Sequence, residues 1–192
     1  MRVDLRGVRI GFQGDVNPVA DLTVARMVAN GASVMQGGTA AVPDILLISL
    51  QLVPVEGIVV PPLQAVAAAA GDGMVARGSG RIIFLLSAAA AMPMRRHPHY
   101  SMQMAVMLTV MRTLAMRLAP GVLVNAVGVG AIGDPLVAGD AAMVGHASVG
   151  RPGTIEEVAD TVLFLCDPAN TYLTGQMLSV DGGWSAGYGR NF

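Results

Sequence analysis

Short apolar segments alternate with longer segments of helical periodicity along most of the chain. The apolar segments predict strands at residues 8–12, 31–35, 44–50, 81–86, 122–127 and 174–180. The longer segments predict helices at residues 17–30, 63–77, 100–118 and 154–166, and the last of these opens with the capping-box pattern TIEE. Because strands alternate with helices, the chain predicts an α/β fold with a parallel sheet, in a single domain over residues 1–192.

The turn after the first strand, QGDVNPVA, is a poor site for a phosphate. Dinucleotide-binding turns carry several glycines so that backbone N–H groups can approach a pyrophosphate. Here only Gly14 remains, a proline removes one N–H, and Asp15 would repel a phosphate. An acidic residue that could bind a ribose is also missing, since no Asp or Glu lies between Asp21 and Asp44. We therefore expect a degenerate cofactor-binding half, about residues 1–50, with Gly14 as a relic.

The connection between the second and third predicted strands is unusually short. Only residues 36–43 separate them, whereas parallel neighbours usually need a crossover of about a dozen residues or more. A strand and its helices are therefore expected to be missing on the side where an adenosine would bind. The predicted architecture is a truncated, Rossmann-type, doubly wound parallel sheet.

The composition suggests that much of the surface is covered by other subunits. Apolar residues make up 53% of the chain and charged residues 13%, about half the usual charged share of roughly 25%. An Ala/Val/Gly-rich monomer is the alternative. The predicted helix 100–118 is apolar on nearly every side, and seven of the 13 methionines lie between Met92 and Met116, which fits an adaptable interface or irregular core packing. The candidate interface residues are Met102, Val106, Met107, Val110, Met111, Leu114 and Trp184.

Charge and cysteine content exclude several classes of function. The formal net charge is −1 and no basic cluster points to nucleic acid or to an anionic membrane. Cys166 is the only cysteine, so no internal disulfide can form. No apolar segment is long enough to span a bilayer, and the histidines lack the spacing of a metal site. The chain is expected to be a soluble cytoplasmic protein without a metal.

Two loops carry further candidate chemistry. The loop 88–99 contains Arg95 and Arg96, and it is either a solvated basic loop or one that faces an anion, such as a coenzyme A phosphate or an acidic partner. The segment GVGAIG, residues 128–133, matches the G-x-G-x-x-G sequence pattern of dinucleotide-binding turns. We reject that reading because Asp134-Pro135 follows where a helix should open, and we expect a loop.

Several stretches resemble the short-chain dehydrogenase/reductase family. The similarity lies in GRIIFLLS (80–87), Tyr100, LAPGVLVNAV (118–127), GRPGTIEEVADTVLFL (150–165) and YLTGQMLSVDGGWSA (172–186). These stretches keep the family's order and spacing, and with the intervening chain they span more than half of the sequence. The first half keeps the strand positions and has lost the glycine motif.

The resemblance implies a damaged catalytic site. In the family a tyrosine exchanges a proton with the substrate oxygen, a serine holds that oxygen, and a lysine lowers the tyrosine pKa and binds the nicotinamide ribose. Ser87 and Tyr100 match the serine and the tyrosine, whereas Met104 stands at the lysine position and the chain contains no lysine. Without a cation, a tyrosine keeps a pKa near ~10, so about a thousandth is ionised at pH 7.

These observations predict a catalytically inactive subunit. It is expected to bind no cofactor itself and to form a hetero-oligomer, a tetramer, with an active full-length paralogue that binds NAD. The complex would be an alcohol dehydrogenase of the hydroxyacyl-CoA type. Two alternatives are an enzyme that uses Ser87 and Tyr100 without a cofactor, and a protein that binds an acyl or coenzyme A ligand.

Overall fold

The computed structural model describes residues 1–35, 41–55 and 62–187. The strands are β1 (Arg9–Gly14), β2 (Ser33–Val34), β3 (Ile45–Ser49), β4 (Gly80–Ser87), β5 (Val122–Val129) and β6 (Met177–Val180). The α-helices are α1 (Pro18–Ala29), α2 (Leu63–Arg77), α3 (Pro98–Leu118), α4 (Ala141–His146) and α5 (Ile155–Cys166), with short 3-10 turns η1 (Ala88–Ala90) and η2 (Trp184–Ala186).

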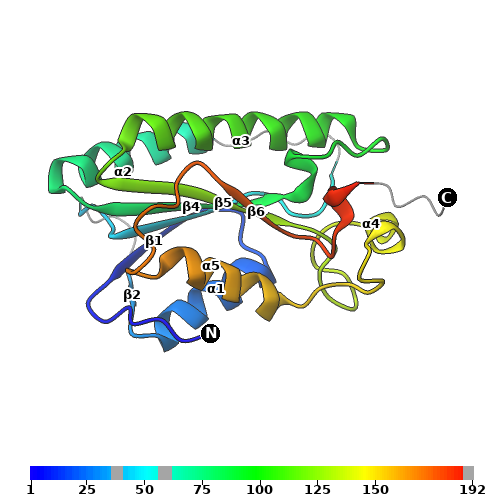
Figure 1. Cartoon of the computed structure of the whole chain (residues 1–192), viewed down its shortest axis with the longest axis horizontal. Helices are drawn as coiled ribbons and strands as arrows, with labels where there is room; N and C mark the ends of the chain where they lie inside the picture. The colour runs from blue at the N-terminus through cyan, green and yellow to red at the C-terminus, as the bar shows by residue number, and fades with distance from the viewer. Residues whose placement is uncertain (36–40, 56–61, 188–192) are drawn as a thin grey trace.

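The six strands form one parallel sheet in the order β2-β1-β3-β4-β5-β6. Helices α2 and α3 cover one face, and α1 and α5 cover the other (Figure 1). This confirms the predicted α/β, doubly wound, Rossmann-like sheet. The strand order reverses beside β1, because the chain goes from β1 to β2 on one side and then returns to β3 on the other. Ligands bind at such reversals in open α/β sheets, at the carboxyl ends of the strands.

The sheet is narrow on the β2 side. In the part of the chain that the structure describes, no strand lies beyond β2, which has two residues and exposed side chains. Residues 36–40 of the short connection lie outside the described residues. The remainder of the connection crosses close over β1, since a Cβ at Gly11 would lie 3.1 Å from Cγ of Pro43. Pro43 therefore packs against β1 at Gly11, where a side chain would leave it too little room.

The central strands are apolar because both of their faces are buried. All five residues of β3 are buried, and so are the last six of β4. Along β4 the side chains alternate, with Phe84 facing α2 and α3 while Ile83 and Leu85 face α1 and α5. The Cys166 thiol is buried, and burial raises its pKa to about 12.

In the single chain, one face of helix α3 is buried against the sheet and the opposite face is exposed, although both faces carry apolar residues. Met107, Met111 and Leu114 point into the core against the sheet, because they recur at intervals of three and four residues, as one face of a helix does. They are not available to a partner, so their assignment to an interface is wrong. Met102 and Val106 are exposed, and Val110 is half-buried against the core.

The loop after β5 is held by neighbouring backbone. Ile132 forms bridges with Ala138 and Gly153. Only glycine fits at position 130, because a Cβ there would lie 2.5 Å from Cα of Asp181. Gly128 and Val129 of the GVGAIG segment end β5 and pair with β6, so the expected loop begins only at Gly130. No helix among the described residues is long and apolar enough to cross a membrane.

Candidate functional site

The tyrosine and the serine singled out by the sequence meet at the carboxyl edge of the sheet. Ser87 is the last residue of β4, and its Oγ accepts a hydrogen bond of 3.2 Å from the Ala89 N–H, which caps η1. Tyr100 lies in the first turn of α3 and donates a hydrogen bond of 2.8 Å to the backbone carbonyl of Gln51, just after β3. The tyrosine proton is therefore held by the protein's own backbone.

The environment of Tyr100 opposes ionisation. The ring is 3% exposed and Ser87 is fully buried. Burial raises the pKa of Tyr100 to about 12, the charge on Asp15 adds to the rise, and a hydrogen bond with Ser87 acts in the opposite direction. A general acid–base group works best with a pKa near the working pH. The pKa of Tyr100 lies further from that range than the pKa of an ordinary tyrosine.

Met104 lies one helical turn beyond Tyr100 and is 1% exposed. Its thioether belongs to the same apolar cluster as Tyr100, Leu108 and Phe84. An ammonium group at this position would be removed from water without a partner, which is costly. The position has thus become part of the core.

Gly14 is required by the backbone of the neighbouring strand. Its φ is +102°, and a Cβ at this position would lie 2.0 Å from the carbonyl oxygen of Ser49. The Asp15 N–H donates to the same oxygen at 2.8 Å. The glycine therefore serves close packing of β1 against β3.

The start of α1 is capped by the chain itself. The Asn17 side chain accepts from the Ala20 N–H at 3.0 Å and donates to Oδ2 of Asp15 at 3.1 Å and to Oγ of Ser49 at 2.9 Å. One of the N–H groups at the helix start is thereby satisfied, and a carboxylate is held beside it. A phosphate at this place would meet the negative charge of Asp15.

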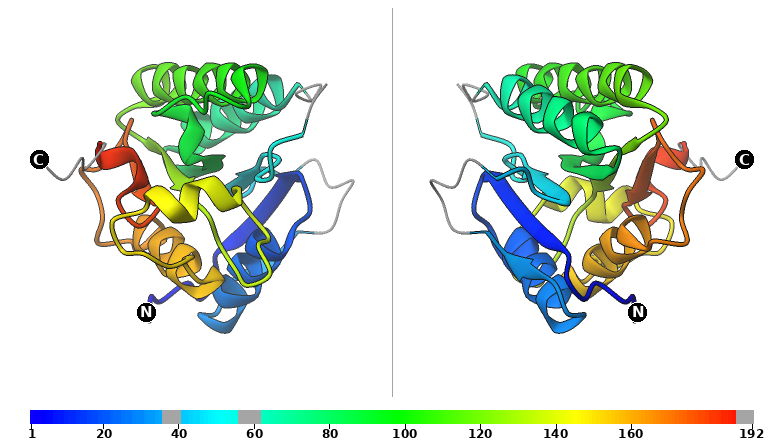
Figure 2. Two further views of the ribbon diagram at one scale, coloured as in Figure 1. Left: turned by 90° about the vertical axis from the view of Figure 1, so that its right-hand side faces the viewer. Right: turned by 90° about the vertical axis from the view of Figure 1, so that its left-hand side faces the viewer.

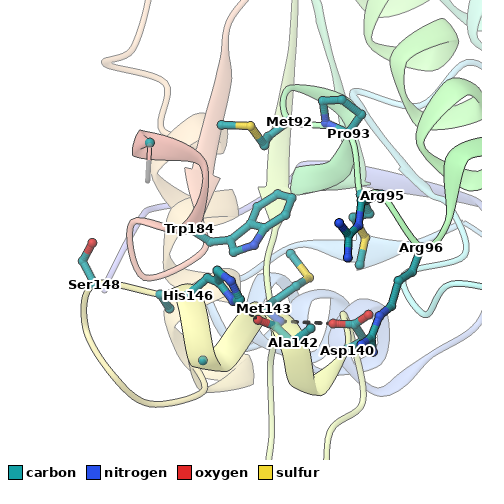
Figure 3. Close-up of a pocket in the computed structure, with 14 residues that line it drawn as sticks. Met92, Pro93, Arg95, Arg96, Asp140, Ala142, Met143, His146, Ser148 and Trp184 are labelled. Atoms are coloured by element: carbon teal, nitrogen blue, oxygen red, sulfur yellow. Dashed lines mark hydrogen bonds between the residues drawn. The ribbon is translucent and has the colours of Figure 1, made fainter. Parts of the chain in front are cut away.

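A cavity of about 810 Å³ opens nearby, between the η1–α3 connection, α4 and η2 (Figure 3). Its lining includes Arg95 and Arg96, which the sequence had marked, together with Met143, His146 and Trp184. Trp184, in η2, also lines this cavity, and its role in a subunit interface stays a prediction. Neither Ser87 nor Tyr100 is among the lining residues.

Sequence reasoning missed Met143 and His146 because α4 has only six residues, too few for a visible helical period. The available signal was Asp140, whose side chain accepts from the Met143 N–H as an N-cap. It also missed the hydrogen bond between Tyr100 and the Gln51 carbonyl, which joins positions 49 residues apart, whereas Asn17 is the N-cap of α1 as the Asn-Pro pair predicts. Within the described ranges, no group of three or more His, Cys, Asp or Glu side chains could hold a metal ion.

The comparisons with known proteins agree with this architecture. Residues 59–185 match a family model described as enoyl-(acyl carrier protein) reductase, which is more than half of the chain. The chain belongs to the short-chain dehydrogenase/reductase family. It is 38% identical over 128 residues to the short-chain reductase protein NovJ of Streptomyces niveus, which covers 60% of this chain and 48% of NovJ. It is 36% identical over 119 residues to cis-4-hydroxycyclohexanecarboxylate dehydrogenase of Sinomonas cyclohexanicum, covering 59% of this chain and 48% of that enzyme.

The chain thus matches about half the length of these curated relatives. Solved structures show the same fold along nearly the whole chain. The ligand-free aldohexose dehydrogenase of Thermoplasma acidophilum superposes with a TM-score of 0.74 at 16% identity, covering 100% of this chain and 99% of that one. Acetoin dehydrogenase YohF of Salmonella typhimurium gives 0.67 at 23% identity, covering 95% and 89%.

Members of this family typically bind NAD(P), and the residues found here do not fit that cofactor. The helix N-terminus is capped by Asn17, Asp15 lies where a phosphate would be repelled, and the second strand ends without an acidic residue. The sheet has the topology of dinucleotide-binding folds, whereas the residues of the turn between β1 and α1 form hydrogen bonds and packing contacts within the protein.

Proposed function

We propose that this chain is a catalytically inactive member of its family, a subunit that assembles with an active, NAD-dependent paralogue. The observation that carries the proposal is the pair Tyr100 and Met104. The tyrosine proton is bonded to the Gln51 carbonyl and its pKa is about 12. The neighbouring position that could supply a cation is a buried methionine.

The outer face of α3 supports an assembly role. Met102 and Val106 are each 60% exposed and Met116 is 77% exposed. The hydroxyls of Thr109 and Thr113 donate to carbonyls one turn earlier, at 3.0 and 2.9 Å, so these residues add little polarity to the face. Exposed apolar patches of this kind mark interaction surfaces.

Helices α2 and α3 lie side by side as one outer layer (Figure 2). The exposed positions of α2 include Ala65, Ala69 and Val75. Small residues allow a second pair of helices to approach closely. The layer therefore suits packing against a similar layer of the partner subunit, in a tetramer that contains both chains.

In the finer form of the proposal the complex is an alcohol dehydrogenase for a hydroxyacyl-CoA substrate. The arrangement would be similar to 2-(hydroxybenzyl)succinyl-CoA dehydrogenase of anaerobic toluene degradation, in which a truncated small subunit accompanies an active one. NAD would be bound and reduced by the partner only.

The test is co-expression with a full-length paralogue encoded beside this chain. We expect a stable complex that oxidises a hydroxyacyl-CoA with NAD. Tyr100→Phe in this chain should leave the kcat of the complex unchanged, whereas the corresponding change in the partner should abolish it. Calorimetry of the isolated chain should show no heat of NAD(H) binding. Saturable NAD(H) binding by the isolated chain would overturn the proposal.

The cofactor-independent alternative is less well supported, because Ser87 and Tyr100 are both buried away from the cavity. If the isolated chain turned over a substrate and Tyr100→Phe abolished this turnover, the alternative would replace the subunit proposal.

A further inference from the structure

We propose that Met102 and Met116, on the outer face of α3, are sites of reversible oxidation by hydrogen peroxide, and that their oxidation weakens assembly. The first half of this inference concerns the isolated chain alone. The second half rests on the proposed function, because it needs the partner subunit that would cover α3.

Helix α3 carries methionines on both of its faces. Met102 and Met116 are 60% and 77% exposed, whereas Met104, Met107 and Met111 are at most 1% exposed. An oxidant must reach the sulfur of a methionine to react with it, so susceptibility follows exposure. The same helix therefore holds two methionines that peroxide can reach and three that the core protects.

The two exposed methionines lie at the ends of one stripe along the helix. The exposed positions 102, 106, 109, 113 and 116 recur at intervals of four and three residues, which is the spacing of a seam between packed helices. The hydroxyls of Thr109 and Thr113, in the middle of the stripe, already donate to carbonyls of α3 itself. A helix that packs along this stripe would cover both methionines.

The chemical step adds one oxygen atom to each sulfur. The thioether sulfur attacks one oxygen of the peroxide, an S–O bond forms as the O–O bond breaks, and the departing hydroxide takes the proton of the transferred oxygen and leaves as water. The sulfur loses two electrons, which reduce the peroxide. A dithiol-dependent methionine sulfoxide reductase reverses the step, with one disulfide and one water as its other products.

The product changes the polarity of the stripe. A thioether is apolar and adapts to a packed interface, whereas a sulfoxide is polar and is well solvated in water. In the free chain, a sulfoxide at position 102 or 116 stays exposed and leaves the core untouched. Under a partner subunit it would be desolvated, which costs free energy unless a donor meets it. Oxidation should therefore act on assembly and leave the fold of the chain in place.

The first measurement locates the oxidised residues. The isolated chain is treated with hydrogen peroxide, the peroxide is removed with catalase, and tandem mass spectrometry of its peptides follows each methionine over time. We expect Met102 and Met116 to be oxidised at least about tenfold faster than Met104, Met107 and Met111, with an unchanged circular dichroism spectrum. Equal rates on the two faces of α3 would overturn the inference.

The second measurement compares assembly before and after oxidation. The oxidised chain is mixed with the untreated paralogue, and analytical ultracentrifugation gives the affinity. We expect a loss of at least about tenfold, which methionine sulfoxide reductases with dithiothreitol should restore. Unchanged affinity after oxidation would overturn the assembly half alone. A reduced chain that does not assemble would overturn the proposed function as well, so the two failures are distinguishable.

Variants test whether these two sulfurs are responsible. Met102→Leu with Met116→Leu keeps the apolar character and nearly the same volume, so this double variant should assemble like the wild type and resist peroxide. Met35→Leu with Met92→Leu, at half-buried positions outside α3, is the matched control and should remain sensitive. Sensitivity that the first pair retains, or that the control pair loses, would overturn the proposal.

Discussion

At the scale of single residues, Tyr100, Ser87 and Met104 each have a structural role. The Tyr100 hydroxyl donates to the Gln51 carbonyl and so joins α3 to the end of β3. The Ser87 hydroxyl caps η1. Met104 is buried in the apolar cluster that includes Tyr100.

The raised pKa of Tyr100 predicts a dependence of stability on alkaline pH. The folded value of about 12 exceeds the ordinary value of 10.0, so the neutral phenol contributes stability that is fully present below pH 10 and is lost as the pH rises towards 12. Tyr100→Phe should cost about 1 kcal/mol at pH 7, because it leaves the Gln51 carbonyl without its donor. Urea unfolding at several pH values should show a flatter alkaline limb for the variant. A phenolate signal from Tyr100 near neutral pH, obtained by subtracting the absorbance of the variant, would contradict the assignment.

Gly14→Ala should destabilise the fold strongly. The new methyl group would meet the Ser49 carbonyl oxygen at 2.0 Å, at a φ of +102°, and the combined clash and strain should cost about 2–4 kcal/mol. Gly145→Ala is the matched control, because a Cβ there meets nothing within 4 Å. It should be neutral or slightly stabilising within α4. Chemical denaturation of both variants measures the difference, and equal effects would mean that Gly14 is not held by β3.

At the scale of elements, the described end of the short connection before β3, residues 41–43, is held by side chains of neighbouring elements. Arg9 of β1 and Arg77 of α2 both donate to the carbonyl of Val42, and Arg77 also donates to the carbonyl of Pro43. Both arginines form ion pairs with Asp44, at 3.0 and 3.1 Å. The described end of the connection is thus held by side chains from the two elements beside it.

Asp44→Asn should loosen this arrangement. We expect a loss of about 1–2 kcal/mol at pH 7, since several charge-assisted hydrogen bonds at a partly exposed site are weakened. Hydrogen bonding from Arg9 lowers the pKa of Asp44 below its ordinary 3.8, so the stabilisation is present above that value and is lost as the pH falls through the lower, folded value. The gap between wild type and variant in urea unfolding should therefore narrow as the pH is lowered from 7 to below 3.8. Asp72→Asn, which loses one exposed pair with Arg117, should cost less than about 0.5 kcal/mol.

At the scale of the whole molecule, the sheet is covered by two helical layers, and on one side it ends at the two-residue strand β2. The outer faces of the two helical layers differ. The α2–α3 layer is the one with the exposed methionines Met102 and Met116, while α1 and α5 contact each other across the opposite face. An assembly through α3 therefore leaves the folded core of each chain intact.

Val106→Glu should weaken that assembly and leave the isolated chain stable. Val106 is 60% exposed, so a charge there stays in water in the free chain and is buried only when a partner covers α3. We expect at least about a tenfold loss of affinity for the paralogue, with a change of less than about 1 kcal/mol in the free energy of unfolding. Light scattering and analytical ultracentrifugation of the complex provide the measurement. Val28→Glu, exposed on α1, is the control that should assemble normally, and an unaffected Val106→Glu complex would place the interface elsewhere.

The sequence by itself determined the order of the strands and of the four longer helices, the parallel sheet and the capping box at Thr154. These features depend on local periodicity, on caps and on which residue types are present, so they are readable along the chain. Only the tertiary structure decided which face of α3 is buried, that the Tyr100 proton is held by Gln51, and that Arg95, Arg96 and Trp184 border one cavity. The physical reason is that these relations join positions about ten to ninety residues apart, and they exist only once the strands have set the helices and loops in place.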